Sequence, residues 1–544
     1  MRRFLHIITP WIITAALLWA APLDGLAQGS LPAIAAPNCD YGGELKSIEA
    51  LDALTVQFTL CYPDPGLPAK VALPAFAIHS AEQLRTAGAS AAFLNSPVGT
   101  GPYRLERWIA GEEIVFSANP YHWGAPPVEP SVILRWNSEG AARWAALQNG
   151  EVDGIDNVRP QDFLEIDTNG QYKLYPRSPA NVFYLGINNT VPPFNNPNVR
   201  LAMAYAINKQ EIVATHFPPD TITASQFLPP SIFGYTADAN SIPYDPGRAQ
   251  QLLAESGVPL PIETTLSYRE AVRVYLPEPG VVARDIQAQL AEVGINVTLE
   301  LMDSGEFLDA VDSGQLSLHL LGWDADYPDA TNFLDYHFGA GGSAQFGAKD
   351  SRLTDVLARA GRLSDGAERL RLYKEANNLI DSIVPMVPIA HGISATAYAA
   401  RIRGAYSSLF AAEQFRVMDD PNDDHIIFLQ NAEPLSLYCN DESDGETFRA
   451  CEQINESLLG YELSGGDVVP ALALEWSANE DATQWTFKLR PNVQFSDGSS
   501  FDAEDVILTW AAMWDASSPL HQGRIGDFSY FSSFFGAFLN APPS

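Results

Sequence analysis

The stretch VVARDIQAQLAEVGINVTLEL, residues 281–301, limits the possible folds more than any other part of the sequence. An apolar stripe at helical spacing is formed by Ala283, Ile286, Leu290 and Val293. Gly294 breaks this pattern, and apolar residues then alternate from Ile295 to Leu301, as in a strand. A helix that feeds directly into a strand, followed by another helical stretch over 369–380 and an apolar run over 384–390, predicts an α/β domain with a substantial sheet.

Other segments carry their own start and stop signals. Asn196 and Asp245 are suited to cap helices that open with the prolines that follow them, and Gly257 is suited to end the second helix. Two stretches far apart in the sequence, TVQFTL (55–60) and WTFKLR (485–490), alternate apolar and polar residues and predict half-buried strands.

Length and charge restrict the class of protein. A chain of 544 residues is too long for one ordinary core, which favours two to four domains or a bilobed unit. The formal net charge of -34 repels nucleic acid and attracts cations and amines, so we expect no nucleic-acid partner.

The N-terminus is typical of a secretory signal. Arg2 and Arg3 precede an apolar run, and the small-residue pattern that ends at Ala27 predicts a signal peptide over 1–27, followed by a linker over 28–43. The alternative is an uncleaved membrane anchor over 4–21. A second, acidic linker is expected over 416–425.

Four cysteines in an exported chain predict disulfides, for which three connectivities are possible. Cys439 with Cys451 closes a short local loop, which leaves Cys39 with Cys61. The alternative is four buried thiols.

The sequence offers little for catalysis or metal binding. It contains no glycine-rich phosphate loop, HExxH or CxxC, and we expect no cofactor or metal. The loop over 440–451 is similar to a calcium loop, but Cys451 stands where a bidentate glutamate is required.

Asp324 and Asp326 stand two positions apart at the end of a predicted strand, beside Trp323 and Tyr327. On a strand, two such carboxylates lie roughly 6.5 Å apart on one face, a spacing compatible with a glycoside hydrolase. Carboxylates among apolar neighbours also need a cationic or hydrogen-bonding partner, which makes this pair a candidate binding site.

Many stretches of the chain resemble the solute-binding proteins of ABC importers, specifically the class that binds peptides and nickel (family 5). They include SPVGTGPYRLERW (96–108), ALQNGEVDGI (146–155), LGWDADYPDATNFL (321–334) and the long block over 468–510. The resemblance implies a secreted or periplasmic, non-catalytic receptor, active as a monomer, that delivers a peptide-like ligand to a membrane permease.

The order of these blocks differs from that of the family, in which the block resembling 425–535 comes before the one resembling 44–418. A circular permutant explains this order if the original termini lay close together at the surface. The competing explanation is a fragment of a tandem pair. For the function, a non-functional gene fragment is a further alternative, which predicts low thermal stability and no ligand-induced shift. A permutant packs strands 55–60 and 485–490 into one domain of the same molecule, whereas a fragment leaves their edges open or swaps them between chains.

The resemblance also implies an α/β fold of the bilobed type II periplasmic-binding-protein class with an additional small α/β domain. The first lobe would comprise 97–188 with 401–470, the second lobe 189–400, and the small domain 44–96 with 471–535. The lobes would hinge near 184–190 and near 400.

In peptide-binding relatives, the aspartate that matches Asp326 pairs with the α-ammonium group of the ligand. Trp323 and Tyr327 would then form the walls of side-chain pockets, and Asp324 would be a turn residue or support Asp326. Some relatives carry a basic residue for the ligand carboxylate at the position of Leu320, so a carboxylate partner of that type is absent. Binders of oligosaccharides or metal chelates share most of these motifs and remain alternatives, as does a secreted hydrolase.

Overall fold

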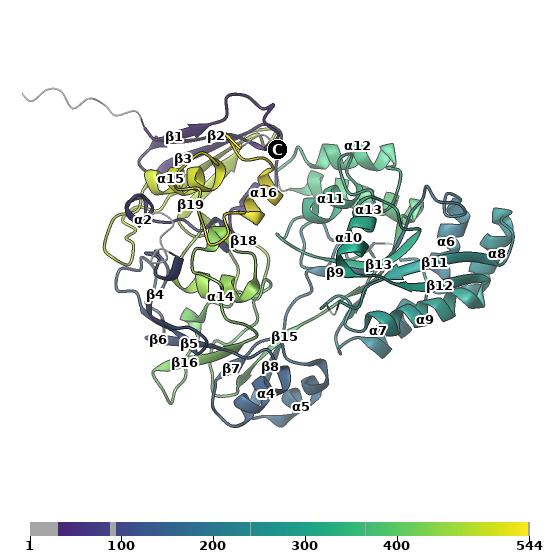
Figure 1. The fold of residues 1–544 in the computed structure, drawn as a ribbon, viewed down its shortest axis with the longest axis horizontal. Helices are drawn as coiled ribbons and strands as arrows, with labels where there is room; N and C mark the ends of the chain where they lie inside the picture. Colours follow the sequence, from purple (N-terminus) through teal and green to yellow (C-terminus); the bar gives the residue numbers. More distant parts are fainter. Residues whose placement is uncertain (1–30, 88–93, 240, 272, 365, 542–544) are drawn as a thin grey trace, which may run out of the picture. The chain divides into compact units, whose positions relative to one another are not determined.

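The computed structural model describes residues 31–87, 94–239, 241–271, 273–364 and 366–541 (Figure 1). The expected signal peptide lies outside these residues. Residues 32–544 form one compact unit. None of the helices in the described segments is long and apolar enough to cross a membrane.

A five-stranded antiparallel sheet joins the two ends of the described chain. Its strands, in spatial order, are β1 (Ala33–Ala35), β2 (Leu45–Asp52), β3 (Thr55–Leu60), β20 (Gln484–Leu489) and β19 (Ala473–Ala478). In Figure 1 the yellow C-terminal helix α15 (Ala503–Trp514) lies beside the purple strands β2 and β3. The linker expected over 28–43 is therefore wrong in part, because Ala33–Ala35 pair with β2.

The alternating pattern of the two central strands produces this pairing. Phe58 of β3 and Phe487 of β20 are both fully buried, and their ring centroids lie 5.4 Å apart. Trp510 of α15 packs edge-on against Phe58 at 4.9 Å. The expectation that strands 55–60 and 485–490 meet within one molecule is confirmed. The circular permutation itself stays a hypothesis.

A seven-stranded sheet forms a second part of the molecule. Its strands are β4 (Tyr103–Ile109), β5 (Glu113–Ala118), β6 (Ser131–Trp136), β16 (His425–Gln430), β7 (Gly154–Ile155), β15 (Ala395–Ala399) and β8 (Tyr172–Pro176). β16 lies between β6 and β7 and pairs with both in parallel, so a late strand completes a sheet of early strands. Helices associated with this part are α4 (Gly140–Gln148), α5 (Phe163–Asn169) and α14 (Gly445–Ile454).

A six-stranded sheet forms the third part. Its strands are β10 (Ile222–Thr223), β14 (Met386–His391), β9 (Asn181–Ile187), β13 (Leu318–Asp324), β11 (Ile262–Tyr268) and β12 (Ile295–Leu301). Helices around it include α6 (Pro197–Ala206), α7 (Lys209–His216), α8 (Pro246–Ser256), α9 (Pro279–Glu292), α10 (Ser304–Asp312), α12 (Ser351–Ala360) and α13 (Ala367–Ile383). The capping predictions are confirmed, since the side chains of Asn196 and Asp245 accept backbone N–H bonds at the starts of α6 and α8.

Two lobe boundaries differ from those expected after residue 188 and after residue 400. β9, at 181–187, belongs to the six-stranded sheet, and β15, at 395–399, belongs to the seven-stranded sheet. The chain therefore crosses between these sheets at 177–180 and at 392–394. Sequence patterns do not assign these two strands to a sheet, because both are largely apolar and are buried along their whole length.

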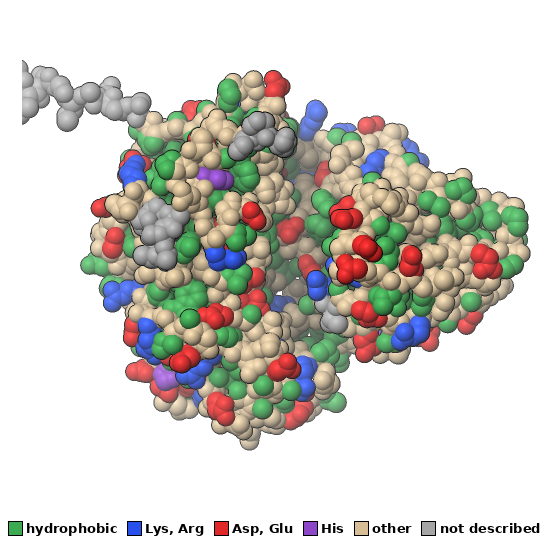
Figure 2. Space-filling view, in the orientation of Figure 1, with side chains coloured by type: hydrophobic (Ala, Val, Ile, Leu, Met, Phe, Trp, Pro, Cys, Tyr) green, Lys and Arg blue, Asp and Glu red, His purple; other side chains and the backbone are tan. Residues whose placement is uncertain are grey.

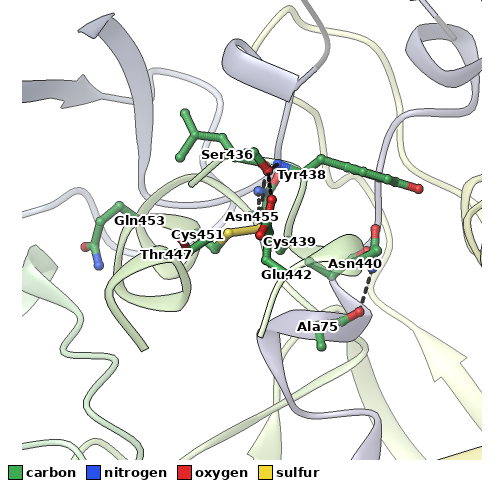
Figure 3. Close-up of a disulfide and its surroundings, with 12 residues drawn as sticks. Ala75, Ser436, Tyr438, Cys439, Asn440, Glu442, Thr447, Cys451, Gln453 and Asn455 are labelled. Atoms are coloured by element: carbon green, nitrogen blue, oxygen red, sulfur yellow. Dashed lines mark hydrogen bonds between the residues drawn. A yellow bond between two sulfur atoms is a disulfide. The ribbon is translucent and has the colours of Figure 1, made fainter. Parts of the chain in front are cut away.

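Both disulfide pairs are present, Cys39 with Cys61 and Cys439 with Cys451. Figure 3 shows the second pair, which links Cys439 in a buried turn to Cys451 in the helix α14 that follows it. Beside it, the Asn440 side chain donates to the backbone oxygen of Ala75 at 2.8 Å. This hydrogen bond holds the segment after β16 against the segment after β3, and the disulfide fixes the turn that carries Asn440.

Four buried charges form a closed ring beside the crossover at 177–180. Asp156 accepts from Arg177 at 2.7 Å and from Arg449 at 2.6 Å, and Glu413 accepts from the same two arginines at 2.7 Å. Each side chain is at most 5% exposed. Burial alone would raise the pKa values of the two carboxyl groups, but the two guanidinium groups outweigh it and hold both below their ordinary values.

The acidic segment 416–425 packs against the rest of the protein and does not form a loose linker. Met418 is fully buried, and the carboxylate of the buried Asp420 accepts from Arg401 at 2.9 Å. Ion pairs and one apolar anchor therefore fix a segment whose composition predicts a linker.

Tyr327 connects the six-stranded sheet with the core of the five-stranded sheet. It follows β13, but its ring packs against Phe534 at 5.0 Å and lies 5.6 Å from the ammonium group of Lys70. Only 7% of the residue is exposed. Aromatic burial and a cation–π contact therefore join two sheets that are separate in hydrogen bonding.

We expect Arg449→Met to lower the free energy of unfolding by about 3 to 5 kcal/mol, because it leaves two buried carboxylates with one cation. Urea unfolding at pH 7 measures this loss. The control is Arg371→Met, which removes an exposed arginine of α13 paired with Glu368 and Glu375 and should leave stability nearly unchanged.

Because the pKa values of the two ring carboxyl groups are lowered, the contribution of the ring to the free energy of unfolding is present above about pH 4. It is lost as the pH falls through the pKa values of the folded state.

We expect Tyr327→Ala to destabilise the protein by about 3 to 5 kcal/mol, as for other buried aromatic truncations. Tyr244→Ala is the control, since Tyr244 is 42% exposed. Chemical denaturation compares the two variants. Equal, small losses in both would mean that the Tyr327 ring does not hold the two parts together.

Candidate binding site

A cavity of about 890 Å³ lies where the chain crosses between the six- and seven-stranded sheets. Its lining comes from both crossovers, from the loops after β11 and β13, and from the start of α14. Segments from the early, middle and late parts of the sequence therefore meet around one space. Acidic side chains are spread over the face of the molecule drawn in Figure 2.

The two crossovers are hydrogen-bonded to each other under this cavity. The side chain of Asn181 donates to the backbone oxygen of Gly392 at 2.9 Å and accepts from its N–H at 2.8 Å. The Arg177 N–H donates to the backbone oxygen of Ser394 at 2.8 Å. A Cβ at Gly392 would lie 2.1 Å from the backbone oxygen of Val274, so only glycine fits this approach.

Asp326 lies in the turn after β13 and lines the cavity. Asn332 orients it: the Asn332 amide donates to the Asp326 carboxylate at 2.9 Å, and its oxygen accepts from the Asp326 N–H at 3.0 Å. The same oxygen accepts from the Trp323 indole at 3.1 Å. Burial raises the pKa of Asp326, while the bond from Asn332 lowers it in part.

Asp324 is the last residue of β13 and also lines the cavity. Its side chain reaches water, but the surrounding protein displaces much of its hydration shell. Burial raises the pKa of Asp324 to about 6; the positive charge of Arg273 opposes this shift, and the nearby charge of Asp326 adds to it.

The premise of the hydrolase interpretation is wrong. Asp324 ends the strand and Asp326 lies beyond it, so the two carboxylates are not neighbours on one face of a strand. The calcium interpretation fails as well, because the Asp441 carboxylate accepts from the backbone of 525, 526 and 528 and Glu442 pairs with Arg524. Among the described residues, an exposed cluster of Asp423, Asp424 and His425 could gather around a metal ion.

The aromatic residues occupy positions other than those expected. Trp323 and Tyr327 are not among the residues that line the cavity. Trp323 stacks on Tyr336 with ring centroids 4.4 Å apart and holds Asn332, while Tyr327 lies in the core described above. Trp323 therefore supports the Asp326 turn from behind.

Arg273 is the cavity residue that the sequence analysis missed. It follows β11, which pairs in parallel with β13, so the loops that carry Arg273 and Asp326 leave the same edge of the sheet. Ligands bind at the carboxyl ends of parallel strands in many α/β proteins. A charged residue shortly after a predicted parallel strand was the signal that could have identified it.

Aromatic and acidic residues from the late part of the chain complete the lining. They are Asp444, Glu446, Phe448 and Tyr530. Four carboxyl groups line the cavity with two arginines, Arg177 and Arg273, so acidic charge is in excess. Such a cavity favours a ligand with positive charge at one end and can accommodate a carboxylate near Arg273.

Comparison with known proteins places the sequence in a family. Bacterial extracellular solute-binding proteins of family 5 match residues 21–345 and 467–526. Heme-binding protein A of Haemophilus influenzae is 28% identical over 401 residues, 72% of this chain and 73% of that protein. Di/tripeptide-binding protein 4 of Pseudomonas aeruginosa is 31% identical over 392 residues, 70% of each chain.

The solved structure of HbpA2 from Haemophilus parasuis superimposes with a TM-score of 0.66 at 28% identity, over 69% of this chain and 75% of that one. The protein therefore has the type II periplasmic-binding-protein fold that its sequence predicts. With the sheets, the two crossovers and the cavity beside them, the matches show that this chain belongs to the bacterial extracellular solute-binding proteins of family 5.

Proposed function

We propose that this protein is the receptor of an ABC importer, that it captures short peptides with free termini in the cavity beside the crossovers, and that it delivers them to the membrane permease. The observation that carries the proposal is the placement of Asp326 and Arg273 on loops that leave the same edge of the six-stranded sheet and line one cavity. The protein acts as a monomer and does not alter its ligand.

A zwitterionic peptide complements this arrangement. Its α-ammonium group donates to Asp326, which Asn332 already orients, and its carboxylate accepts from Arg273. The carboxylate partner thus follows β11, whereas Leu320, the position that is basic in some relatives, is 2% exposed within β13. The Asp324 carboxylate adds negative charge beside the ammonium group.

The crossovers provide the means of closure. Both connections at 177–180 and 392–394 contribute to the cavity lining, so a rotation about them changes the cavity directly. Their mutual hydrogen bonds keep the two strands moving together. A peptide that bridges Asp326 and α14 would stabilise the closed arrangement.

We expect Asp326→Asn to weaken binding of trialanine by about 2 to 5 kcal/mol, because it removes a charge that pairs with a buried ammonium group. The sharper result is a loss of discrimination: the wild-type protein rejects N-acetylated trialanine, and the variant binds both peptides equally weakly. Arg273→Met should likewise abolish discrimination between trialanine and its C-terminal amide. Isothermal titration calorimetry measures each dissociation constant.

The matched controls are Asp355→Asn and Arg359→Met, exposed positions of α12 outside the cavity. An unchanged dissociation constant in Asp326→Asn removes the role of that residue. If the wild-type protein binds no di- or tripeptide, the ligand class is wrong.

We expect the affinity for trialanine to rise from pH 5 to pH 7.5. The pKa of Asp324 is raised to about 6, and the ammonium group of the peptide favours the ionised carboxylate. Below this pH, Asp324 is protonated in the free protein and must lose its proton when the peptide binds, so the affinity falls as the pH falls. The gain should be about threefold to tenfold, corresponding to a pKa decrease of up to one unit on binding. Asp324→Asn should flatten the profile, and a profile of the same slope in that variant would contradict the assignment.

A further inference from the structure

A second cavity, of about 790 Å³, lies between the seven-stranded sheet and the small two-stranded sheet of β17 (Leu459–Tyr461) and β18 (Val468–Pro470). Trp123 and Pro470 belong to its walls, and Glu452 and Glu456 face it from the end of α14 and the segment that follows. The binding site described above uses none of these residues.

A third, small cavity, called the neck below, lies between this cavity and the first one (the peptide cavity), because its lining includes residues of both. The neck shares Pro74, Phe410 and Ala412 with the peptide cavity, and it shares Gln414, Glu452, Tyr461, Glu462 and Leu463 with the second cavity. The rings of Phe410 and Tyr461 pack along it with centroids 5.0 Å apart. Its volume of about 20 Å³ holds little more than one water molecule, so an unbranched chain fits better than a branched or aromatic group.

The two glutamates are held by neutral donors. The Gln414 amide donates to Glu452 at 3.0 Å, and the Trp123 indole donates to Glu456 at 2.8 Å. Burial raises the pKa values of both carboxyl groups to about 7. Among the described residues, no cationic group lies within ion-pair distance of either carboxylate, although the charges of Arg416 and Arg490 act on them from farther away.

The other charges near the second cavity leave acid in excess. Arg416 and Glu462 line it with the two glutamates, and His122, whose pKa burial lowers, also faces it. Arg490 lies outside the lining, 3.6 Å from the centroid of the Trp123 ring, and acts on Glu456 from there. Three carboxylates face one lining guanidinium group, and a further cation would balance the charge.

We propose that the second cavity is a specificity pocket for a lysine side chain of the bound peptide, which passes through the neck and places its ammonium group between Glu452 and Glu456. This inference rests on the proposed function, because the peptide backbone would lie in the first cavity. The unbranched lysine chain matches the neck, and the carboxylates match its charge. The pocket thus makes the protein a binder of basic tripeptides.

The test compares lysine with norleucine, an unbranched residue without the charge. Calorimetry measures dissociation constants at pH 7.5 for Ala-Lys-Ala and Ala-Ala-Lys, their norleucine counterparts, and trialanine. In the wild-type protein we expect at least one lysine peptide to bind about tenfold more tightly than its norleucine counterpart, as for other hydrogen bonds to charged groups.

The double variant Glu452→Gln with Glu456→Gln should reduce this ratio to about one and leave trialanine affinity unchanged. Glutamine resembles the protonated glutamates and can still accept the bonds from Gln414 and Trp123, so the fold should tolerate it. The control is Glu475→Gln with Glu480→Gln, two exposed positions. Lysine binding should also release protons at pH 7, which titrations in buffers of different ionisation enthalpy detect.

The outcomes separate the two proposals. If trialanine binds but the wild-type ratio is near one for both positions, the lysine pocket is wrong and the peptide receptor stands. A tenfold ratio that survives in the double glutamine variant also overturns the pocket, because another group then recognises the lysine. If no peptide binds, both proposals fall.

Discussion

The closed ring of Asp156, Arg177, Glu413 and Arg449 is the interaction on which the arrangement of this molecule depends. It joins the end of β7, the first crossover, the loop before β16 and the helix α14, which belong to distant parts of the sequence. A buried ring of this kind adds less stability than its contacts suggest, but each member is required once the others are buried. It therefore fixes the geometry of the crossover that borders the binding cavity.

The late part of the chain is integral to the structure. β16 fills a gap between β6 and β7, β20 completes the sheet of β1 to β3, and α14 supplies acidic residues to both cavities. A strand that lies between two partners satisfies backbone groups on both of its edges, so neither sheet is complete without it. The order of the segments along the chain matters less than their presence in one molecule.

Electrostatics of the cavities follow from the same plan. The loops that follow the parallel strands β11 and β13 leave the same edge of the sheet. They place a cation, Arg273, and an anion, Asp326, in the lining of one cavity, where the two could bind the oppositely charged ends of a zwitterion. Behind the neck, glutamates with raised pKa values face a second space. A cationic ligand stabilises the ionised form of such carboxylates. This agrees with the acidic character of the whole chain, which attracts cations.

The sequence by itself determined the α/β class, the caps at Asn196 and Asp245, and the strands 55–60 and 485–490, because these depend on local periodicity and backbone chemistry. The role of Asp326 stays a prediction that rests on the family resemblance. Only the tertiary structure decided that Tyr327 packs away from the cavity and that Arg273 lines it. It also decided that β9 belongs to the six-stranded sheet and β15 to the seven-stranded sheet, and that Glu452 and Glu456 face a second cavity. These features depend on contacts between residues tens to hundreds of positions apart, on which local patterns carry no information.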